Sequence, residues 1–279
     1  MLLTLRQPAG LPLSVDLARA QVKQDITDDD LLLTAYIGAA ADYAEAQIQR
    51  SLLVTRFCYQ MDAFPGPSLF GVPPGEPFTI PGHAALLPRT PLRKMEAINY
   101  LDMGGAWQTM PPSDYVVDDG AITRITPCFG KIWPIPLPQL GAVKLTFLAG
   151  YATSILDVQT SALTFDLWGA LQVGDPVRLS NSGGALPAPL KPKRDYYVAS
   201  IDGNTLTVSD APGGQAIQLA DAGTGQHYLG EIPEGIIAWM LLRIDSLYAH
   251  RGEVAIIQGR MEPLPYVDRL LDPFRSPEY

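Results

Sequence analysis

The residues of this chain that could do chemistry are few and are spread widely. Three aspartates stand in a row at Asp28, Asp29 and Asp30, and carboxylates are good ligands for hard cations. Consecutive residues on a helix point in different directions, however, so the row cannot converge easily on one ion. Acidic residues also suit the first turn of a helix. We therefore expect a helix start here and no metal site.

Cysteine and histidine add little to this inventory. Cys58 and Cys128 are too few for a disulfide framework and form no C-x-x-C pair, so we expect buried thiols. His83 lies far from both His227, which we interpret as a structural residue of a strand, and His250, which we place at a helix end. A nucleophilic pair of Cys128 with His83 has no support beyond the residue types.

Catalytic sequence motifs are absent as well. The sequence contains no G-x-x-x-x-G-K-[ST], G-x-G-x-x-G, H-E-x-x-H or G-x-S-x-G. We predict that the protein is not an enzyme and uses no cofactor or metal. A deep pocket with several converging polar groups would be needed to revive an enzymatic function.

Composition and charge describe a globular, acidic protein. The 279 residues are 47% apolar, and the net charge is −9 with a pI near 4.8. Gripping phosphates requires clustered Lys and Arg, so an acidic chain favours DNA that passes by without being held. No run of eighteen apolar residues and no secretory leader is apparent. We expect no membrane partner and assembly in a cytoplasm.

The first sixty residues have the pattern of helices. Ser14 is placed to cap a helix from Val15 to Gln24, and Thr27 to cap a second one from Asp28 to Ser51, with Asp30 as the acid of a capping box. Apolar residues recur along the second helix every three or four positions. Its small residues would let another backbone approach closely, within one subunit or between subunits. These possible subunit contacts are Gly38, Ala39 and Ala41.

From Val54 the pattern changes to the alternation of a strand, and a loop rich in Pro and Gly follows from Phe64 to Pro77. A series of short strands comes next, with Gly104 and Gly105 in a tight hairpin turn. The expected strands are Phe78–Ile80, Ala84–Leu87, Met95–Asp102, Ala106–Met110, Tyr115–Val117, Ala121–Thr126 and Ala142–Ala149.

Five segments in order carry a family resemblance. They are SVDLARAQVKQDITDDDLLLTAYIGAAADYAEAQIQRSL, LLPRTPLRKMEAINYLDMGGAWQTMPPSDYVVDDGAITRI, GKIWP, VKLTFLAGY and IPEGIIAWMLLRIDSLYAHRGE. Together they resemble the head-tail connector (adaptor, or head-completion) proteins of long-tailed bacteriophages and related prophages. Each piece alone is weak, and the specificity lies in their succession.

The resemblance implies a structural role without chemistry. Members of that family form a ring of about twelve like subunits, which docks under the portal protein of a capsid and conducts DNA without specific binding. The ring then offers a surface to a tail terminator or another tail-neck protein. The implied location is the virion neck at the head-tail junction, assembled in the bacterial host cytoplasm.

The segment from Ser154 to Glu231 interrupts the resemblance and has its own pattern. Alternating runs are separated by Gly183-Gly184, Gly213-Gly214 and the turn Asp202-Gly203. They predict a small antiparallel β module, a barrel or a sandwich, similar to modules of phage tail proteins. Its termini should meet at one surface of the host domain.

The chain after the closing helix is apolar and broken by prolines, from Pro263 to Tyr279. It either folds back on its own domain or reaches into a partner. The resemblance favours the second interpretation, in which the tail docks on the portal. The predicted anchors of this tail are Tyr266, Leu271, Phe274 and Tyr279.

The predicted fold class is therefore α+β, with a helical body, an antiparallel β platform and the inserted β module. The expected domains are residues 1–153 (connector), 154–231 (insert), 232–262 (closing helix) and 263–279 (portal-docking tail). An alternative function is a tail or baseplate component whose β module binds a host or tail partner. Exposed aromatic residues in a cleft, such as Trp168 or Tyr196, would favour that alternative.

Overall fold

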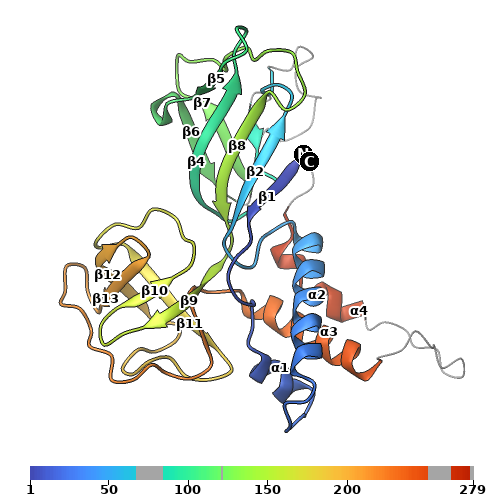
Figure 1. The fold of residues 1–279 in the computed structure, drawn as a ribbon, viewed down its shortest axis with the longest axis vertical. Helices are drawn as coiled ribbons and strands as arrows, with labels where there is room; N and C mark the ends of the chain where they lie inside the picture. The colour runs from blue at the N-terminus through green and yellow to red at the C-terminus, as the bar shows by residue number, and fades with distance from the viewer. Residues whose placement is uncertain (67–83, 121, 251–264, 277–279) are drawn as a thin grey trace, which may run out of the picture. The chain divides into compact units, whose positions relative to one another are not determined.

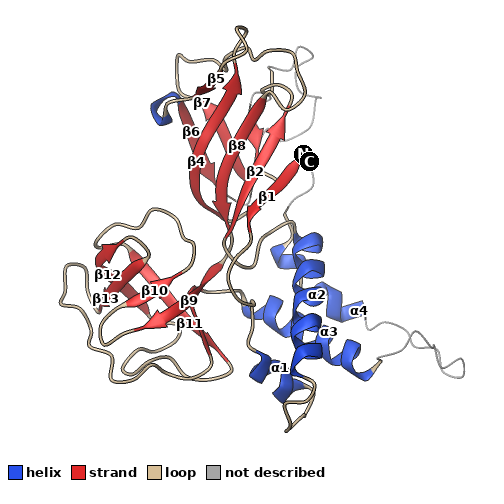
Figure 2. Cartoon of the chain, viewed as in Figure 1, coloured by secondary structure: helices blue, strands red, loops and turns tan. Residues whose placement is uncertain are grey.

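The computed structural model describes residues 1–66, 84–120, 122–250 and 265–276. Helices and antiparallel strands are both present, which confirms the predicted α+β class (Figures 1 and 2). The chain divides into two compact units. The platform unit holds residues 1–7, 55–150 and 276–279, and the body unit holds residues 8–54 and 151–275.

The platform unit contains two antiparallel sheets. The five-stranded sheet has the order β1-β2-β8-β4-β5, and the three-stranded sheet has the order β3-β7-β6. A short 3-10 helix, η1 (Pro112–Asp114), precedes β6. The strands are β1 (Leu2–Arg6), β2 (Thr55–Met61), β3 (Ala85–Leu86), β4 (Leu92–Leu101), β5 (Trp107–Thr109), β6 (Tyr115–Asp119), β7 (Thr123–Pro127) and β8 (Val143–Ala149).

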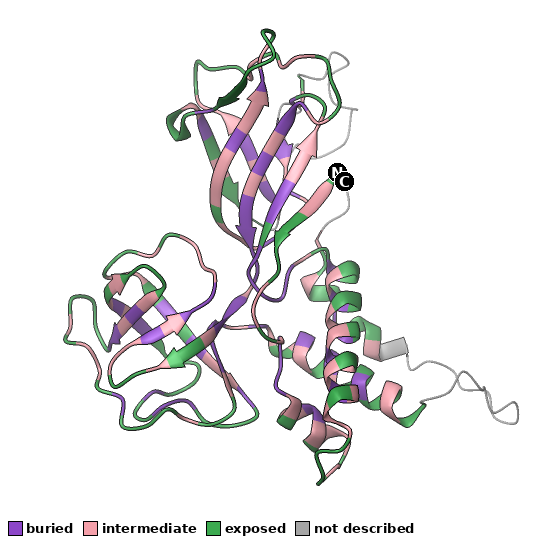
Figure 3. Ribbon diagram, in the orientation of Figure 1, coloured by how far each residue is buried: buried purple, intermediate pink, exposed green. Residues whose placement is uncertain are grey.

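Alternation along the central strand β8 builds the platform core. Val143, Leu145 and Phe147 are fully buried, as residues two apart on one face of a strand should be. They share a cluster with Ile98 of β4 and Ile125 of β7, so both sheets contribute to one core. Figure 3 shows the buried residues recurring along β8.

The sequence pattern located most of these strands, and the structure corrects some of them. The segment Phe78–Ile80 and residue Ala121 lie outside the described residues. β1 pairs with β2, although the first sixty residues were expected to be helical. Its residues Leu2 to Arg6 are too few for their alternation to stand out, and their pairing partners lie fifty or more residues away.

The body unit contains the helices α1 (Val15–Gln21), α2 (Asp30–Ile48), α3 (Glu234–Ala249) and α4 (Pro265–Arg269), followed by the 3-10 helix η2 (Asp272–Phe274). The capping role of Ser14 is confirmed, because its hydroxyl accepts a hydrogen bond from the backbone N–H of Leu17. The predicted capping box of Thr27 and Asp30 is wrong. Helix α2 begins at Asp30 itself, and the carboxylate of Asp30 bonds Arg19 instead.

The inserted module is a closed barrel with the strand order β10-β13-β12-β11-β14-β9. Closure leaves no unpaired sheet edge, and it decides between the two architectures that the sequence left open. Its strands are β9 (Ala152–Val158), β10 (Leu163–Phe165), β11 (Pro176–Ser182), β12 (Asp195–Asp202), β13 (Thr205–Ser209) and β14 (Gln226–Gly230). The barrel has its own core, which includes Val198, Leu206 and Leu229.

Candidate interaction surfaces

The polar residues that drew attention in the sequence have separate structural partners. The Asp30 carboxylate pairs with the Arg19 guanidinium at 2.9 Å. Asp29 accepts a hydrogen bond at 2.6 Å from the hydroxyl of Tyr248 on α3. The aspartates thus tie α2 to its neighbouring helices. Among the described residues, no group of three or more His, Cys, Asp or Glu side chains is arranged to hold a metal ion.

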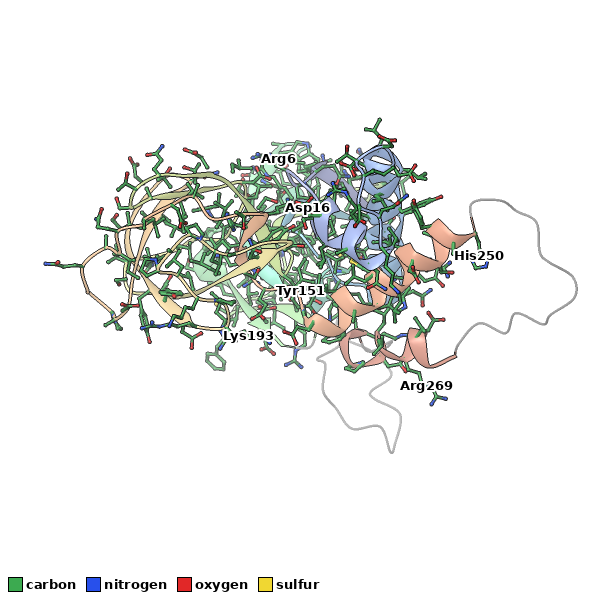
Figure 4. All side chains as sticks on the ribbon, turned by 90° about the horizontal axis from the view of Figure 1, so that it is seen from below. Arg6, Asp16, Tyr151, Lys193, His250 and Arg269 are labelled. Carbon is green, nitrogen blue, oxygen red and sulfur yellow. The ribbon has the colours of Figure 1, made fainter. Side chains whose placement is uncertain are left out.

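The histidines and cysteines also lie apart. His227 is buried, and its ring nitrogens lie 2.8 Å from the Asn181 amide and 2.9 Å from the Ala222 carbonyl, which confirms a structural role. His250 ends α3 and is exposed, as Figure 4 shows. Cys58 is buried and Cys128 is half-buried. His83 lies outside the described residues.

The small residues of α2 divide between two faces. Ala39 is exposed, and a Cβ added at Gly38 would meet nothing within 4 Å. Ala41 instead packs partly against the helical core of its own unit. Gly38 and Ala39 therefore lie on a side of α2 that is open in this chain, whereas Ala41 has an internal neighbour.

The described part of the C-terminal tail lies against α3. Leu271 is only 1% exposed within the helical core, and Phe274 packs against that core. The indole N–H of Trp239 donates to the Asp268 carboxylate at 3.2 Å. Tyr266 lies in α4, and its side chain, like Tyr279, is outside the described residues. In this conformation Leu271 contributes to its own subunit's core.

The barrel is bound to the helical part by a segment that precedes α1. We call residues 8–13 the strap. Its backbone makes three hydrogen bonds with barrel side chains: Ala9 N–H donates to Asp166 at 2.7 Å, Ser154 Oγ donates to the Ala9 carbonyl at 2.6 Å, and Tyr228 donates to the Leu11 carbonyl at 2.7 Å. Burial raises the pKa of Tyr228, so this hydroxyl stays a donor at neutral pH.

The strap ends at a second polar contact. The backbone N–H of Ser14 donates to Ser182 Oγ of β11 at 2.8 Å, and both side chains are buried. Next to them, Gly183 has a φ of +75°, and a Cβ there would lie 2.1 Å from Ser14 Oγ. The residue that caps α1 therefore fits against a barrel turn that only glycine can form.

Ion pairs on the barrel surface add to the same junction. Lys193, labelled in Figure 4, pairs with Glu234 in the first turn of α3. Within the barrel itself, Arg178 of β11 bonds Asp195 of β12 and holds the pKa of that carboxyl below its usual range. A groove of about 340 Å³ between barrel and α3 is lined by residues of both, among them Asn181, Tyr228, Ile237 and Leu241.

The aromatic residues proposed for ligand recognition are turned inward. Tyr196 is 1% exposed and its hydroxyl accepts a hydrogen bond from Lys191 N–H, while Trp168 packs partly against the barrel core. The feature that would have favoured the alternative function, exposed aromatic residues in a cleft, is therefore not found at these two residues. Alternation along β12 places Tyr196 on the interior face, where a closed barrel needs large side chains.

The platform has a pocket of its own. Phe64 and Trp133 stack with ring centroids 4.6 Å apart, and they form part of a cavity of about 620 Å³. The rest of the lining is mainly apolar and comes from the loop after β2, the end of β7 and the loop after β7, including Ala63, Pro127, Ile132, Pro134 and Ile135. No helix in the described part of the chain is long and apolar enough to cross a membrane.

Comparison with known proteins places the fold among parts of virus-like particles. No family model and no curated protein matches this sequence. Among solved structures, a chain in the neck of an empty gene transfer agent (GTA) particle, computed with C6 symmetry, matches with a TM-score of 0.55 and 15% identity. A chain in the virion of a native GTA particle matches with a TM-score of 0.56 and 14% identity.

A third match comes from the neck of a native GTA particle computed with C12 symmetry, with a TM-score of 0.51 and 14% identity. Each of the three comparisons covers 100% of this chain and 97% of the other chain. Both units and the inserted barrel are therefore included in the similarity. At this identity the comparisons establish a shared fold: the chain has the fold of chains found in GTA particles, two of them in the neck.

Proposed function

We propose that this protein is a structural head-tail connector (adaptor) subunit in the neck of a phage or phage-like particle. Copies of the chain form a ring, of about twelve subunits, under the portal protein. DNA passes through the ring, and a tail terminator or other tail-neck protein attaches on its far side. The protein would act by its shape and by binding its neighbours, without a catalytic step.

The observation that carries this proposal is the similarity of fold over the whole chain to chains of GTA necks. A match limited to the barrel would be uninformative, because small barrels occur in many proteins. Here the helices, the platform and the barrel are matched together. The particle necks were computed with cyclic symmetry, which agrees with a ring of like copies.

The charge of the chain supports passage of DNA without capture. Strong binding to the phosphate backbone needs many Lys and Arg contacts, since each displaces a counterion. The chain has 29 acidic and 20 basic residues. Carboxylates around a channel would repel the polyanion and let it slide.

The portal-docking tail belongs to this proposal in a revised form. Leu271 and Phe274 would hold the tail on α3, because both pack against the helical core. Asp268, Arg269 and Asp272 are exposed on the same short segment. These three would face the portal, and Tyr266 and Tyr279 stay predicted anchors of the tail. Gly38 and Ala39 on α2 remain candidates for contact between neighbouring subunits.

The alternative function, a tail or baseplate component that recognises a host through its barrel, has less support. Tyr196 is buried, and the barrel is bonded to the strap and to α3. A barrel bonded in this way to the rest of its chain is more consistent with a structural part of the subunit than with a separate recognition module.

The proposal is tested by producing particles without this chain. A connector is needed after DNA packaging and before tail attachment, so electron microscopy should show heads and free tails that do not join. Supplying the chain in trans should restore complete particles. Normal tailed particles, or heads with tails that fail only to adsorb to hosts, would contradict the connector function.

A further inference from the structure

The platform loop between β7 and β8 carries an unusual set of exposed apolar side chains. In residues 128–140, Phe129 is fully exposed, and Ile132, Leu140 and Ile135 are 85%, 83% and 78% exposed. Scattered single apolar residues are normal on a protein surface, but a dense group of them marks an interaction site. We call these four residues the platform patch.

The loop that bears the patch is tied to the platform along its length. Cys128 N–H donates to the Asp114 carbonyl at 3.0 Å, and Leu137 N–H donates to the Leu101 carbonyl at 2.8 Å. Trp133 stacks on Phe64 between these points. Pro134, Pro136 and Pro138 further restrict the backbone. The exposed side chains are thus presented by an ordered loop, and little entropy is lost when they bind.

The patch adjoins the apolar pocket of about 620 Å³ that contains the Phe64–Trp133 stack. Ile132 and Ile135 line the pocket, whereas Phe129 does not. One copy of the platform therefore offers both a protruding aromatic side chain and a recess that suits one. Aromatic side chains seated in apolar pockets are the commonest centres of binding energy in protein interfaces.

Charge favours this surface for contact between like copies. Lys131 is the single charged residue in 128–140, and its Nζ lies 3.6 Å from the Asp114 carboxylate. Copies with a net charge of −9 repel each other over most of their surface. The loop is apolar and its one cation is already paired. Two such copies can therefore approach here without bringing like charges face to face.

We propose that Phe129 of one copy inserts into the pocket beside Phe64 and Trp133 of a second copy of this chain. In this proposal the contact is heterologous, so that Phe129 and the pocket of one copy engage two different neighbours. Such a contact closes a ring when its rotation divides a full turn. This inference rests on the proposed function for the ring, and it names a surface through which like subunits meet.

A complementation experiment with two variants of the full chain tests the contact. Phe129→Asp removes the inserted side chain and keeps the pocket, while Ala63→Glu obstructs the pocket and keeps Phe129. The two new side chains are both acidic, so they cannot form an ion pair in the mixture. Each variant alone should associate with itself at least about tenfold more weakly than the wild-type chain in sedimentation equilibrium. Mixed together, the two retain one intact contact per pair, so the mixture should form dimers that stop growing.

Met103→Asp is the matched control, since Met103 is an exposed apolar residue of the platform (64%) that does not line the pocket. It should leave self-association unchanged. Wild-type chain that stays monomeric up to its solubility limit, variants that associate normally, or a mixture without dimers would each overturn the proposal. An isologous pair would also keep one intact Phe129 contact in the mixture, but its wild-type chain would stop at dimers, so wild-type species larger than dimers distinguish the heterologous contact.

Portal binding, measured on the same samples, separates this inference from the proposed function. Wild-type chain that self-associates through Phe129 but ignores the portal would leave the contact standing and remove the connector function. If the chain binds the portal and both variants also assemble normally around the portal, the connector function stands and the Phe129 contact is refuted.

Discussion

The barrel and the platform are both built from antiparallel strands, yet their surfaces differ. The barrel closes on itself, and its strands bond the strap and α3 through polar side chains. The platform sheets end in the outer strands β1, β5, β3 and β6, and the platform bears the exposed apolar patch. The barrel is thus joined to the helical body through polar contacts, whereas the platform exposes apolar side chains; we propose that the platform is the part that meets other chains.

The largest effects are expected from variants that destabilise one unit, with the thermal stability of both units measured. Trp239→Ala removes a fully buried side chain that stacks on Tyr43 at 5.5 Å, and should cost the body unit about 3–5 kcal/mol. Phe147→Ala, equally buried beside Phe57, should cost the platform a similar amount. Calorimetry should show each variant lowering a different transition. A single transition lowered equally by both would contradict two separate units.

A smaller change tests the bond between barrel and helices. Gly183→Ala places a Cβ against Ser14 Oγ and also strains a backbone with positive φ. Gly213→Ala is the matched control, since its φ is +70° and a Cβ there meets nothing within 4 Å. We expect about 1–2 kcal/mol of destabilisation for the control and a further ~1–3 kcal/mol for Gly183→Ala. Equal urea midpoints would show that the close approach is unimportant.

Removing single hydrogen bonds to the strap should have a lesser effect. Tyr228→Phe deletes the donor to the Leu11 carbonyl, and Ser182→Ala deletes the acceptor for Ser14 N–H. Each should cost the body unit about 1 kcal/mol, somewhat more where a buried partner is left unsatisfied. Hydrogen exchange should show faster opening of residues 8–14. Platform amides should exchange at the wild-type rate, and faster exchange there would indicate that the strap stabilises both units.

The smallest expected effect concerns the turn between β4 and β5. Hydrogen bonds from the Gln108 amide and from the N–H groups of Ala106 and Gly104 hold the pKa of Asp102 below its usual range. A carboxyl whose pKa is lowered by folding stabilises the folded state at pH values above its unfolded-state pKa, near 3.9. This stabilisation is lost as the pH falls through its folded-state pKa. Asp102→Ala should therefore lower the platform Tm slightly at pH 7, and the difference should shrink below about pH 4. A difference independent of pH would exclude the carboxylate as its cause.

The sequence predicted well those elements whose signals are local. The Ser14 cap, the alternation of β8 and the turn at Asp202-Gly203 each involve residues close together in the chain. The strand β1 was missed because its support comes from pairing with β2. The start of α2 was misplaced: its N-cap residue is Asp29, without a side-chain capping hydrogen bond, and Asp30 pairs with Arg19.

The surfaces were harder to predict than the elements. Nothing in the sequence around residues 8–13 reveals that Asp166, Ser154 and Tyr228 bond that segment, since these partners lie more than a hundred residues away. The inward turn of Tyr196 depends on barrel closure. For the platform patch a signal did exist: one charge among Phe, Ile and Leu residues in a stretch punctuated by prolines. An exposed loop of that composition is the kind of segment on which the proposed contact rests.

The measurement that tests the central claim most directly is the native mass of the full chain, alone and mixed with the portal protein of the same particle. We predict a complex of one portal assembly with a closed ring of this chain, whose mass gives the number of copies. A portal assembly whose mass is unchanged by excess chain would contradict the connector function. The inserted barrel would then be the first place to look for another partner.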